Sequence, residues 1–138
     1  ELPRTAALQI LKHCAPVRQA PERELMIEQV APRDLAAWLQ AARADGAPLL
    51  LDVREPAEWQ RASAHAAGAE LLQLPMHSIP PRLSEFDPER PTAVLCHHGG
   101  RSMQVAMFLQ QQGFARVANV AGGIDAWSLQ LDPSIPRY

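Results

Sequence analysis

Apolar positions along the chain alternate between short runs and helical spacing. We predict a short strand at residues 26–30. In residues 33–44, the side chains Leu35, Trp38, Leu39 and Ala42 recur at the i, i+3, i+4, i+7 spacing of an amphipathic helix. Asp45-Gly46 ends this helix, and we expect Gly46 to supply a left-handed cap. Residues 49–53 are again mostly apolar, as expected of a parallel strand covered on both faces.

The same alternation continues along the rest of the sequence. The further elements that we predict are a helix from Pro56 through Glu58 and Trp59, a turn at 65–69, a proline-rich connection over 75–91, strands at 92–96 and 117–120, and helices at 102–112 and 124–131. Strands that alternate with helices form a parallel sheet with helices on both of its faces. The pattern therefore predicts an α/β fold, a three-layer sandwich.

One domain accounts for most of the sequence. A length of 138 residues fits a single domain with one core, which we assign to residues 26–138. Residues 1–25 are interpreted as an N-terminal extension, because Pro16 and Pro21 end any helix that begins near Ala6. The sequence begins with Glu1 rather than Met, so we expect a fragment or a processed form.

Charge and cysteine content narrow the function classes. A net charge of −2 gives no overall field to attract nucleic acid or an acidic membrane surface. No stretch of the sequence approaches the ~20 apolar residues of a membrane span. Cys14 and Cys96 are too few for a disulfide framework, which favours a reducing compartment, the cytoplasm. The sequence has no nucleotide-binding loop and no spaced set of metal ligands, so we expect no cofactor.

The strongest candidate for chemistry follows the predicted strand at 92–96. Ligands of parallel sheets bind beyond the carboxyl ends of the strands, and Cys96 stands at such an end. The loop that follows it is His97, His98, Gly99, Gly100, Arg101 and Ser102. The two glycines allow backbone N–H groups to turn inward as an anion nest, and we expect Ser102 to cap the next helix. This nest and the positive end of the helix favour the thiolate of Cys96, which is the nucleophilic form.

Four segments, in the right order, resemble the signatures of the rhodanese family. They are Leu51-Asp52-Val53-Arg54-Glu55-Pro56 with Glu58-Trp59, then Ala64-His65-Ala66-Ala67-Gly68-Ala69, then the Cys-x-x-Gly-x-Arg-Ser loop from Cys96 to Ser102, and Asn119-Val120-Ala121-Gly122-Gly123-Ile124-Asp125-Ala126-Trp127. The second segment departs from the family's Gly-His-Ile-Pro-Gly-Ala element by alanine at positions 64, 66 and 67. The resemblance extends over residues 27–127 and implies a rhodanese-like sandwich.

The resemblance also implies a sulfurtransferase that works through a persulfide on Cys96. The Cys96 thiolate would take the outer sulfur of thiosulfate or a similar donor, and cyanide, a thiol or a protein would accept it. Phosphatases and arsenate reductases of this fold have a longer Cys-x5-Arg loop, so the Cys-x4-Arg spacing here argues against them. The alternative is a protein-binding sulfur-relay or regulatory module with little thiosulfate activity of its own.

The other residues of the loop and of the first signature allow more than one role. Arg101 either binds an anionic donor or braces the loop through a neighbouring carboxylate. Arg54 either pairs with an acidic residue or extends a positive rim, whereas Asp52 is expected to fix nearby loops by hydrogen bonds. His97 and His98 are expected to line the mouth, where a protonated imidazole would favour the thiolate. We expect no metal there, because adjacent residues in a tight loop are poorly spaced as ligands.

Overall fold

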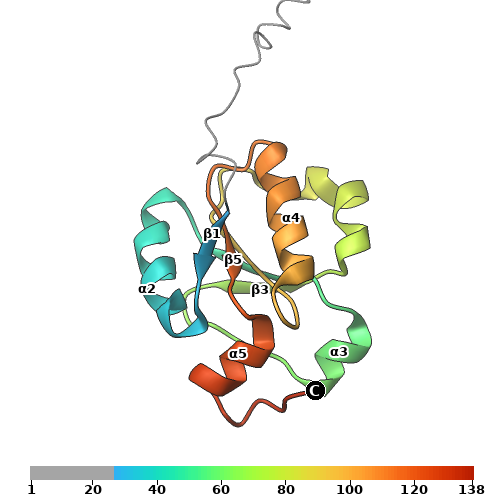
Figure 1. Ribbon diagram of the computed structural model, residues 1–138. Coiled ribbons are helices and arrows are strands. Elements are labelled where there is room, and N and C mark those ends of the chain that lie inside the picture. Colours follow the sequence, from blue (N-terminus) through green and yellow to red (C-terminus); the bar gives the residue numbers. More distant parts are fainter. Residues whose placement is uncertain (1–26) are drawn as a thin grey trace, which may run out of the picture.

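A parallel sheet of five strands forms the centre of the computed structural model, which describes residues 27–138 (Figure 1). The strands are β1 (Glu28–Val30), β2 (Leu49–Asp52), β3 (Glu70–Gln73), β4 (Thr92–Leu95) and β5 (Val117–Val120). Their order across the sheet is β1-β5-β4-β2-β3, and every neighbouring pair is parallel. The expected extension over residues 1–25, with Cys14, lies outside the described residues.

Helices cover both faces of this sheet. The α-helices are α2 (Pro32–Ala42), α3 (Pro56–Arg61), α4 (Gly100–Gln111) and α5 (Gly123–Gln130), and the short 3₁₀ helices are η2 (Arg43–Asp45), η3 (Met76–Ser78) and η4 (Pro80–Glu85). Side chains of α2 and α5 pack in one layer of the core, and side chains of α4, η3 and η4 pack in the other. Figure 1 shows α2 and α4 on opposite sides of the strands. The predicted three-layer α/β sandwich is therefore confirmed.

Alternate residues of the central strands supply the two layers of the core. In β2, Leu50 faces the layer of α2 and α5, whereas Leu49 and Leu51 face the layer of α4. Each of these three side chains is at most 4% exposed. Burial on both faces removes the polar positions that a half-exposed strand would carry, which explains the apolar runs in the sequence.

The fifth strand is a difference from the sequence prediction. The sequence indicated four strands, and residues Glu70–Gln73 were not among them. In the structure they form β3, which pairs with β2 at the edge of the sheet. The strand is only partly buried, and its two leucines stand between Glu70 and Gln73, so it lacks the continuous apolar run by which the central strands were recognised.

The end of the first helix also differs from the prediction. Gly46 was expected to adopt the left-handed cap conformation, but its φ of 140° and ψ of 174° lie elsewhere. The cause is the 3₁₀ turn η2, which continues α2 by three residues and releases the chain in an extended direction. A positive φ of this kind is open to glycine and strained for other residues.

None of the helices in residues 27–138 is both long enough and apolar enough to cross a membrane.

Candidate active site at the end of strand β4

The carboxyl ends of three neighbouring strands bring the candidate residues together. The register of β2 and β4 places Asp52 beside Leu95, so the segments that begin at Val53 and Cys96 leave the sheet side by side. Asn119 lies in β5, on the other side of β4, and pairs with Val94. Cys96 is 1% exposed and packs in the α4 layer of the core. The site is thus built at the edge where ligands of parallel sheets bind.

Two polar groups of the following loop contact the Cys96 sulfur. The backbone N–H of Gly99 donates to Sγ at 3.0 Å, and the hydroxyl oxygen of Ser102 lies 3.2 Å from Sγ. Gly99 has a φ of 108°, a conformation that favours glycine and turns its N–H back toward the cysteine. The Gly99 N–H donates to the sulfur, and the Ser102 hydroxyl is placed to donate to a negatively charged sulfur as well.

The helix after the loop begins earlier than the sequence indicated. Helix α4 starts at Gly100, and the N-cap residue is Gly99 rather than Ser102. The prediction that Ser102 caps this helix is therefore wrong. Because Gly99 adopts the left-handed N-cap conformation, the first turn forms before Ser102, and the serine hydroxyl lies inside this turn, directed at Cys96.

Asn119 orients the Ser102 hydroxyl. Its side-chain oxygen Oδ1 lies 2.5 Å from Ser102 Oγ, and its amide nitrogen donates to Gln29 at 3.0 Å and to the carbonyl of Gly99 at 3.3 Å. These two donated bonds leave Oδ1 facing Ser102. A serine hydroxyl has one hydrogen, so it donates either to Asn119 or to the Cys96 sulfur. In the sequence, Asn119 stands out only as part of the fourth signature and as a polar residue in a predicted buried strand.

Arg101 is engaged by a carboxylate. Its Nη1 and Nη2 donate to the two oxygens of Glu58, at 2.7 and 2.9 Å. The ion pair with Arg101 is the main cause that lowers the pKa of Glu58 to about 2, and it raises the pKa of Arg101 above its usual range. Of the two roles considered for Arg101, this geometry corresponds to bracing the loop.

Asp52 and Arg54 form a second ion pair, fully buried below the loop. Arg54 Nε donates to Asp52 Oδ1 at 2.9 Å and Nη2 donates to Oδ2 at 2.7 Å. The Arg54 guanidinium also donates to the carbonyl of Ala62 at 2.9 Å and to the hydroxyl of Tyr138 at 2.8 Å. With an exposed fraction of 0%, Arg54 pairs with an acid and adds nothing to a positive rim. Such a pair holds its place only when its remaining donors are satisfied, as they are here.

Tyr138 connects these groups, although nothing in the sequence pattern singled it out. Its hydroxyl accepts from Arg54 and donates to Glu58 Oε2 at 2.8 Å. Its ring stacks on the imidazole of His97, with 3.9 Å between centroids. In Figure 1 the C-terminus lies beside α3, the helix that carries Glu58.

His97 is held between two rings. His98 stacks on it at 3.8 Å between centroids, and Tyr138 stacks on it as well. Burial, followed by the neighbouring His98, lowers the pKa of His97. This direction favours the neutral imidazole, so the expectation of a protonated ring that assists the thiolate gains no support at His97.

His97, His98 and Asp125 bring three potential metal ligands within 4.8 Å of one another. The two imidazoles are stacked with 27° between their planes, whereas a metal lies in the plane of each ring that binds it. Asp125 already accepts from Arg137 at 2.8 Å. The arrangement of these three residues does not fit a metal ion.

The start of α5 supports the site from the side of β5. The N–H groups of Ile124 and Asp125 donate to the carbonyls of Cys96 and His97, at 2.8 and 3.1 Å. Gly123 permits this approach, because a Cβ at that position would overlap both carbonyl oxygens. Backbone hydrogen bonds therefore fix the loop at its beginning.

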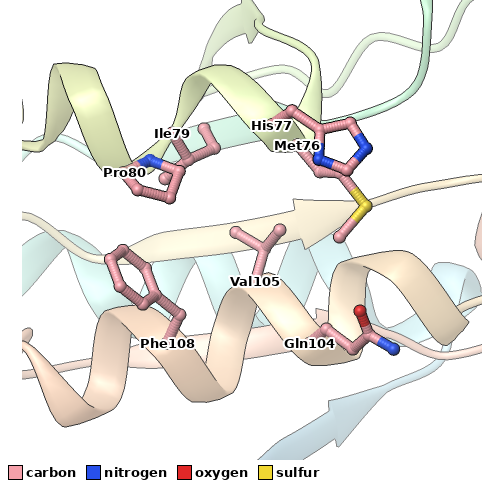
Figure 2. Close-up of a pocket in the computed structure, with 7 residues that line it drawn as sticks. All are labelled: Met76, His77, Ile79, Pro80, Gln104, Val105 and Phe108. Atoms are coloured by element: carbon pink, nitrogen blue, oxygen red, sulfur yellow. The ribbon is translucent and has the colours of Figure 1, made fainter.

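A cavity of about 270 Å³ lies between η3, η4 and α4 (Figure 2). Its lining residues are Met76, His77, Ile79, Pro80, Gln104, Val105 and Phe108. Neither Cys96 nor any residue of its loop contributes to the lining, so this cavity is separate from the candidate active site.

Known proteins resemble this chain in sequence and in fold. It is 41% identical to the rhodanese-like/PpiC domain-containing protein 12, chloroplastic, of Arabidopsis thaliana over 133 residues, which are 95% of this chain and 40% of the relative. The chain thus spans less than half the length of that relative. A sulfurtransferase of Allochromatium vinosum is 46% identical over 80 residues, 58% of this chain and 71% of the relative.

A solved structure agrees with these relatives. The rhodanese-related protein of Thermoplasma volcanium is 27% identical, covers 80% of this chain and 99% of its own, and has a TM-score of 0.62. The model of the rhodanese-like domain matches residues 35–130, the segment that holds the candidate site. By these matches, and in agreement with the four segments noted in its sequence, the chain belongs to the rhodanese-like domain family.

Proposed function

We propose that this protein is a sulfurtransferase in which Cys96 carries the transferred sulfur as a persulfide. The observation that carries the proposal is the environment of the Cys96 sulfur, which accepts the N–H of Gly99 at 3.0 Å and lies 3.2 Å from the Ser102 hydroxyl. These donors stabilise a negative charge on sulfur, first on the thiolate and then on the persulfide. The name of the Allochromatium vinosum relative agrees with this chemistry.

The reaction has two halves. In the first, the Cys96 thiolate attacks the outer sulfur of thiosulfate or a similar donor, the donor's S–S bond breaks, and sulfite leaves with the bonding electrons. In the second, cyanide, a thiol or an acceptor protein attacks the outer sulfur of the persulfide, and Cys96 returns to the thiolate. The division into two displacements is ordinary nucleophilic catalysis and needs no cofactor.

The residues around Cys96 have distinct parts in this proposal. Gly99, and Ser102 once its hydroxyl has turned from Asn119, bind the charged sulfur. Asp52 and Arg54 act as a buried support beneath the loop, and Arg101 braces it through Glu58. A reducing compartment such as the cytoplasm would keep Cys96, a free cysteine in the structure, as a thiol.

Intact mass measurement tests the proposal. The reduced protein is incubated with excess thiosulfate without reductant, alongside a Cys96→Ser variant and a Cys14→Ser variant. We expect a gain of one sulfur atom in the wild type and in Cys14→Ser, its reversal by cyanide, and no gain in Cys96→Ser. A gain that persists in Cys96→Ser would contradict the assignment of the carrier. If a folded, reduced wild type gains no sulfur from thiosulfate or from a persulfide donor, the proposal fails and a regulatory binding module takes its place.

A further inference from the structure

The ion pair of Arg101 with Glu58 changes the charge that a donor meets outside Cys96. The carboxylate occupies both ends of the guanidinium fork, at 2.7 and 2.9 Å. This pairing leaves Nε–H and further N–H groups of Arg101 free for other partners, but it balances the positive charge of the guanidinium with the negative charge of the carboxylate. The Arg101 side chain is 34% exposed, so its position is within reach of a donor while its charge is offset by its partner.

Glu58 keeps this position independently of Arg101. The Tyr138 hydroxyl donates to Oε2 at 2.8 Å, and the backbone N–H of Glu55 donates to Oε1 at 3.0 Å. The latter bond belongs to the capping box at the start of α3. Arg101 most of all, with these two hydrogen bonds in addition, lowers the pKa of Glu58 to about 2, which keeps the carboxylate ionised at neutral pH. The negative charge is therefore a fixed part of the site.

Other charged groups near the loop do not replace the positive charge that Glu58 offsets. Arg54 is buried against Asp52, and Arg137 pairs with Asp125. The Arg61 guanidinium lies 5.1 Å from the centre of the Tyr138 ring, and no carboxylate of residues 27–138 forms an ion pair with it. It lies on the far end of α3 from the capping box, whereas Arg101 belongs to the loop of Cys96.

We propose that Glu58 is a specificity-determining residue that offsets the charge of Arg101 and so disfavours small dianionic sulfur donors at Cys96. This inference rests on the proposed sulfur transfer. The favoured donor class carries less charge than thiosulfate on the group that enters the site: a thiol persulfide, R–S–SH. The Cys96 thiolate attacks the outer sulfur, the S–S bond breaks, and the leaving thiolate takes the proton of the transferred sulfur. The products are R–SH and the Cys96 persulfide anion.

The first test uses two alkylating agents of similar size and different charge. Iodoacetate is an anion and iodoacetamide is neutral, and the rate at Cys96 is followed by peptide mass for each. We expect Glu58→Gln to raise the ratio of the iodoacetate rate to the iodoacetamide rate roughly 3- to 10-fold, and added salt to reduce the effect. The matched control is Glu85→Gln, which removes the same charge from an exposed ion pair with Arg82 on η4 and should leave the ratio unchanged.

A second variant keeps this test decisive if Glu58→Gln folds poorly. Arg101→Gln leaves the Glu58 charge unpaired beside the loop, so we expect the same ratio to fall below that of the wild type. An unchanged ratio in a folded Glu58→Gln or Arg101→Gln protein would overturn the inference.

Measurements of sulfur transfer then distinguish a failure of this inference from a failure of the proposed function. The specificity constants for thiosulfate and for the persulfide of 2-mercaptoethanol are compared in the wild type and in Glu58→Gln. We expect Glu58→Gln to shift the preference toward thiosulfate by a factor similar to the alkylation ratio. If Cys96 accepts sulfur but neither ratio moves, the role of Glu58 is refuted and the sulfurtransferase proposal stands. If the alkylation ratio moves but neither donor loads Cys96, the charge effect stands and the sulfurtransferase proposal fails.

Discussion

The phenol ring of Tyr138 lies flat against the imidazole of His97, with 9° between the two ring planes. The same tyrosine joins Arg54 to Glu58 through its hydroxyl. One side chain therefore links the buried ion pair under the site to the ion pair at its mouth, and it covers the residue that follows Cys96.

The variant Tyr138→Phe tests the contribution of the hydroxyl to stability separately from that of the ring. The variant keeps an aromatic face against His97 but removes one hydrogen-bond partner from Arg54 Nη1 and one from Glu58 Oε2. We expect a loss of about 1–2 kcal/mol in the free energy of unfolding, measured by urea denaturation. Tyr138→Leu, which also removes the stacked ring, should lose more. Equal stability of wild type and Tyr138→Phe would show that the hydroxyl contributes nothing.

Ser102→Ala removes one of the two donors near the Cys96 sulfur. Hydrogen bonds to charged groups contribute about 1.5–3 kcal/mol, so the loss of this donor should slow alkylation of Cys96 by iodoacetamide at neutral pH by roughly 10-fold or more. Ser134→Ala is a suitable control, because that hydroxyl bonds to Asp132 on the surface. A Ser102→Ala rate equal to the wild-type rate would mean that the serine serves Asn119 alone.

Alanine substitutions at two glycines, one at the contact between α5 and the loop and one away from it, test whether this contact requires glycine. Gly123 and Gly113 have positive φ values of 63° and 94°, but a Cβ at Gly113 meets open space, whereas one at Gly123 overlaps the carbonyls of Cys96 and His97. Gly113→Ala should cost about 1–2 kcal/mol of stability from backbone strain alone. Gly123→Ala should cost clearly more and also slow Cys96 alkylation. Similar costs and rates for the two variants would contradict the steric argument.

Glu58 should make stability depend on pH in the acid range. Its pKa is lowered from 4.5 to about 2 in the folded protein, so the unfolded state takes up the proton first as the pH falls. The contribution of Glu58 is therefore complete above about 4.5 and is lost as the pH falls toward about 2. Because the pair is partly exposed, we expect the wild type to exceed Glu58→Gln by about 1–2 kcal/mol at pH 7.

Urea denaturation at a series of pH values measures this difference. The gap between wild type and Glu58→Gln should close between these two pH limits, whereas Glu85→Gln, at an exposed ion pair, should stay close to the wild type throughout. A gap that is constant with pH would contradict the assignment of the acid-sensitive group.

Local pattern was sufficient to predict the layered fold. The run Leu49–Leu51 is buried on both faces, and the helical spacing of Leu35, Trp38 and Leu39 marks the buried side of α2. Strand β3 was not predicted because its residues Glu70–Gln73 hold only two apolar side chains between polar ones, and they are only partly buried. The pattern of apolar residues in a sequence reflects which positions are buried, so an element with few buried residues is hard to predict from this pattern.

The site was predictable in part for a similar reason. The position of Cys96 and the turn at Gly99 follow from short-range sequence, since strand, glycines and helix are consecutive. The partner of Arg101 does not, because Glu58 lies 43 positions earlier and several carboxylates were available. Tyr138 is 80 positions from Glu58, and no periodicity records such a contact.

Distant parts of the sequence complete the surroundings of Cys96. Strand β1 pairs only with β5 among the described strands, and the contacting residues Gln29 and Asn119 are 90 positions apart in the sequence. During synthesis, Cys96 is added to the chain before β5, α5 and Tyr138 have been made. The backbone donors that hold the start of its loop come from Ile124 and Asp125. The nascent chain therefore carries a thiol whose surroundings are incomplete until translation of this domain is almost finished, and an interrupted chain would release a cysteine without the groups that direct its chemistry.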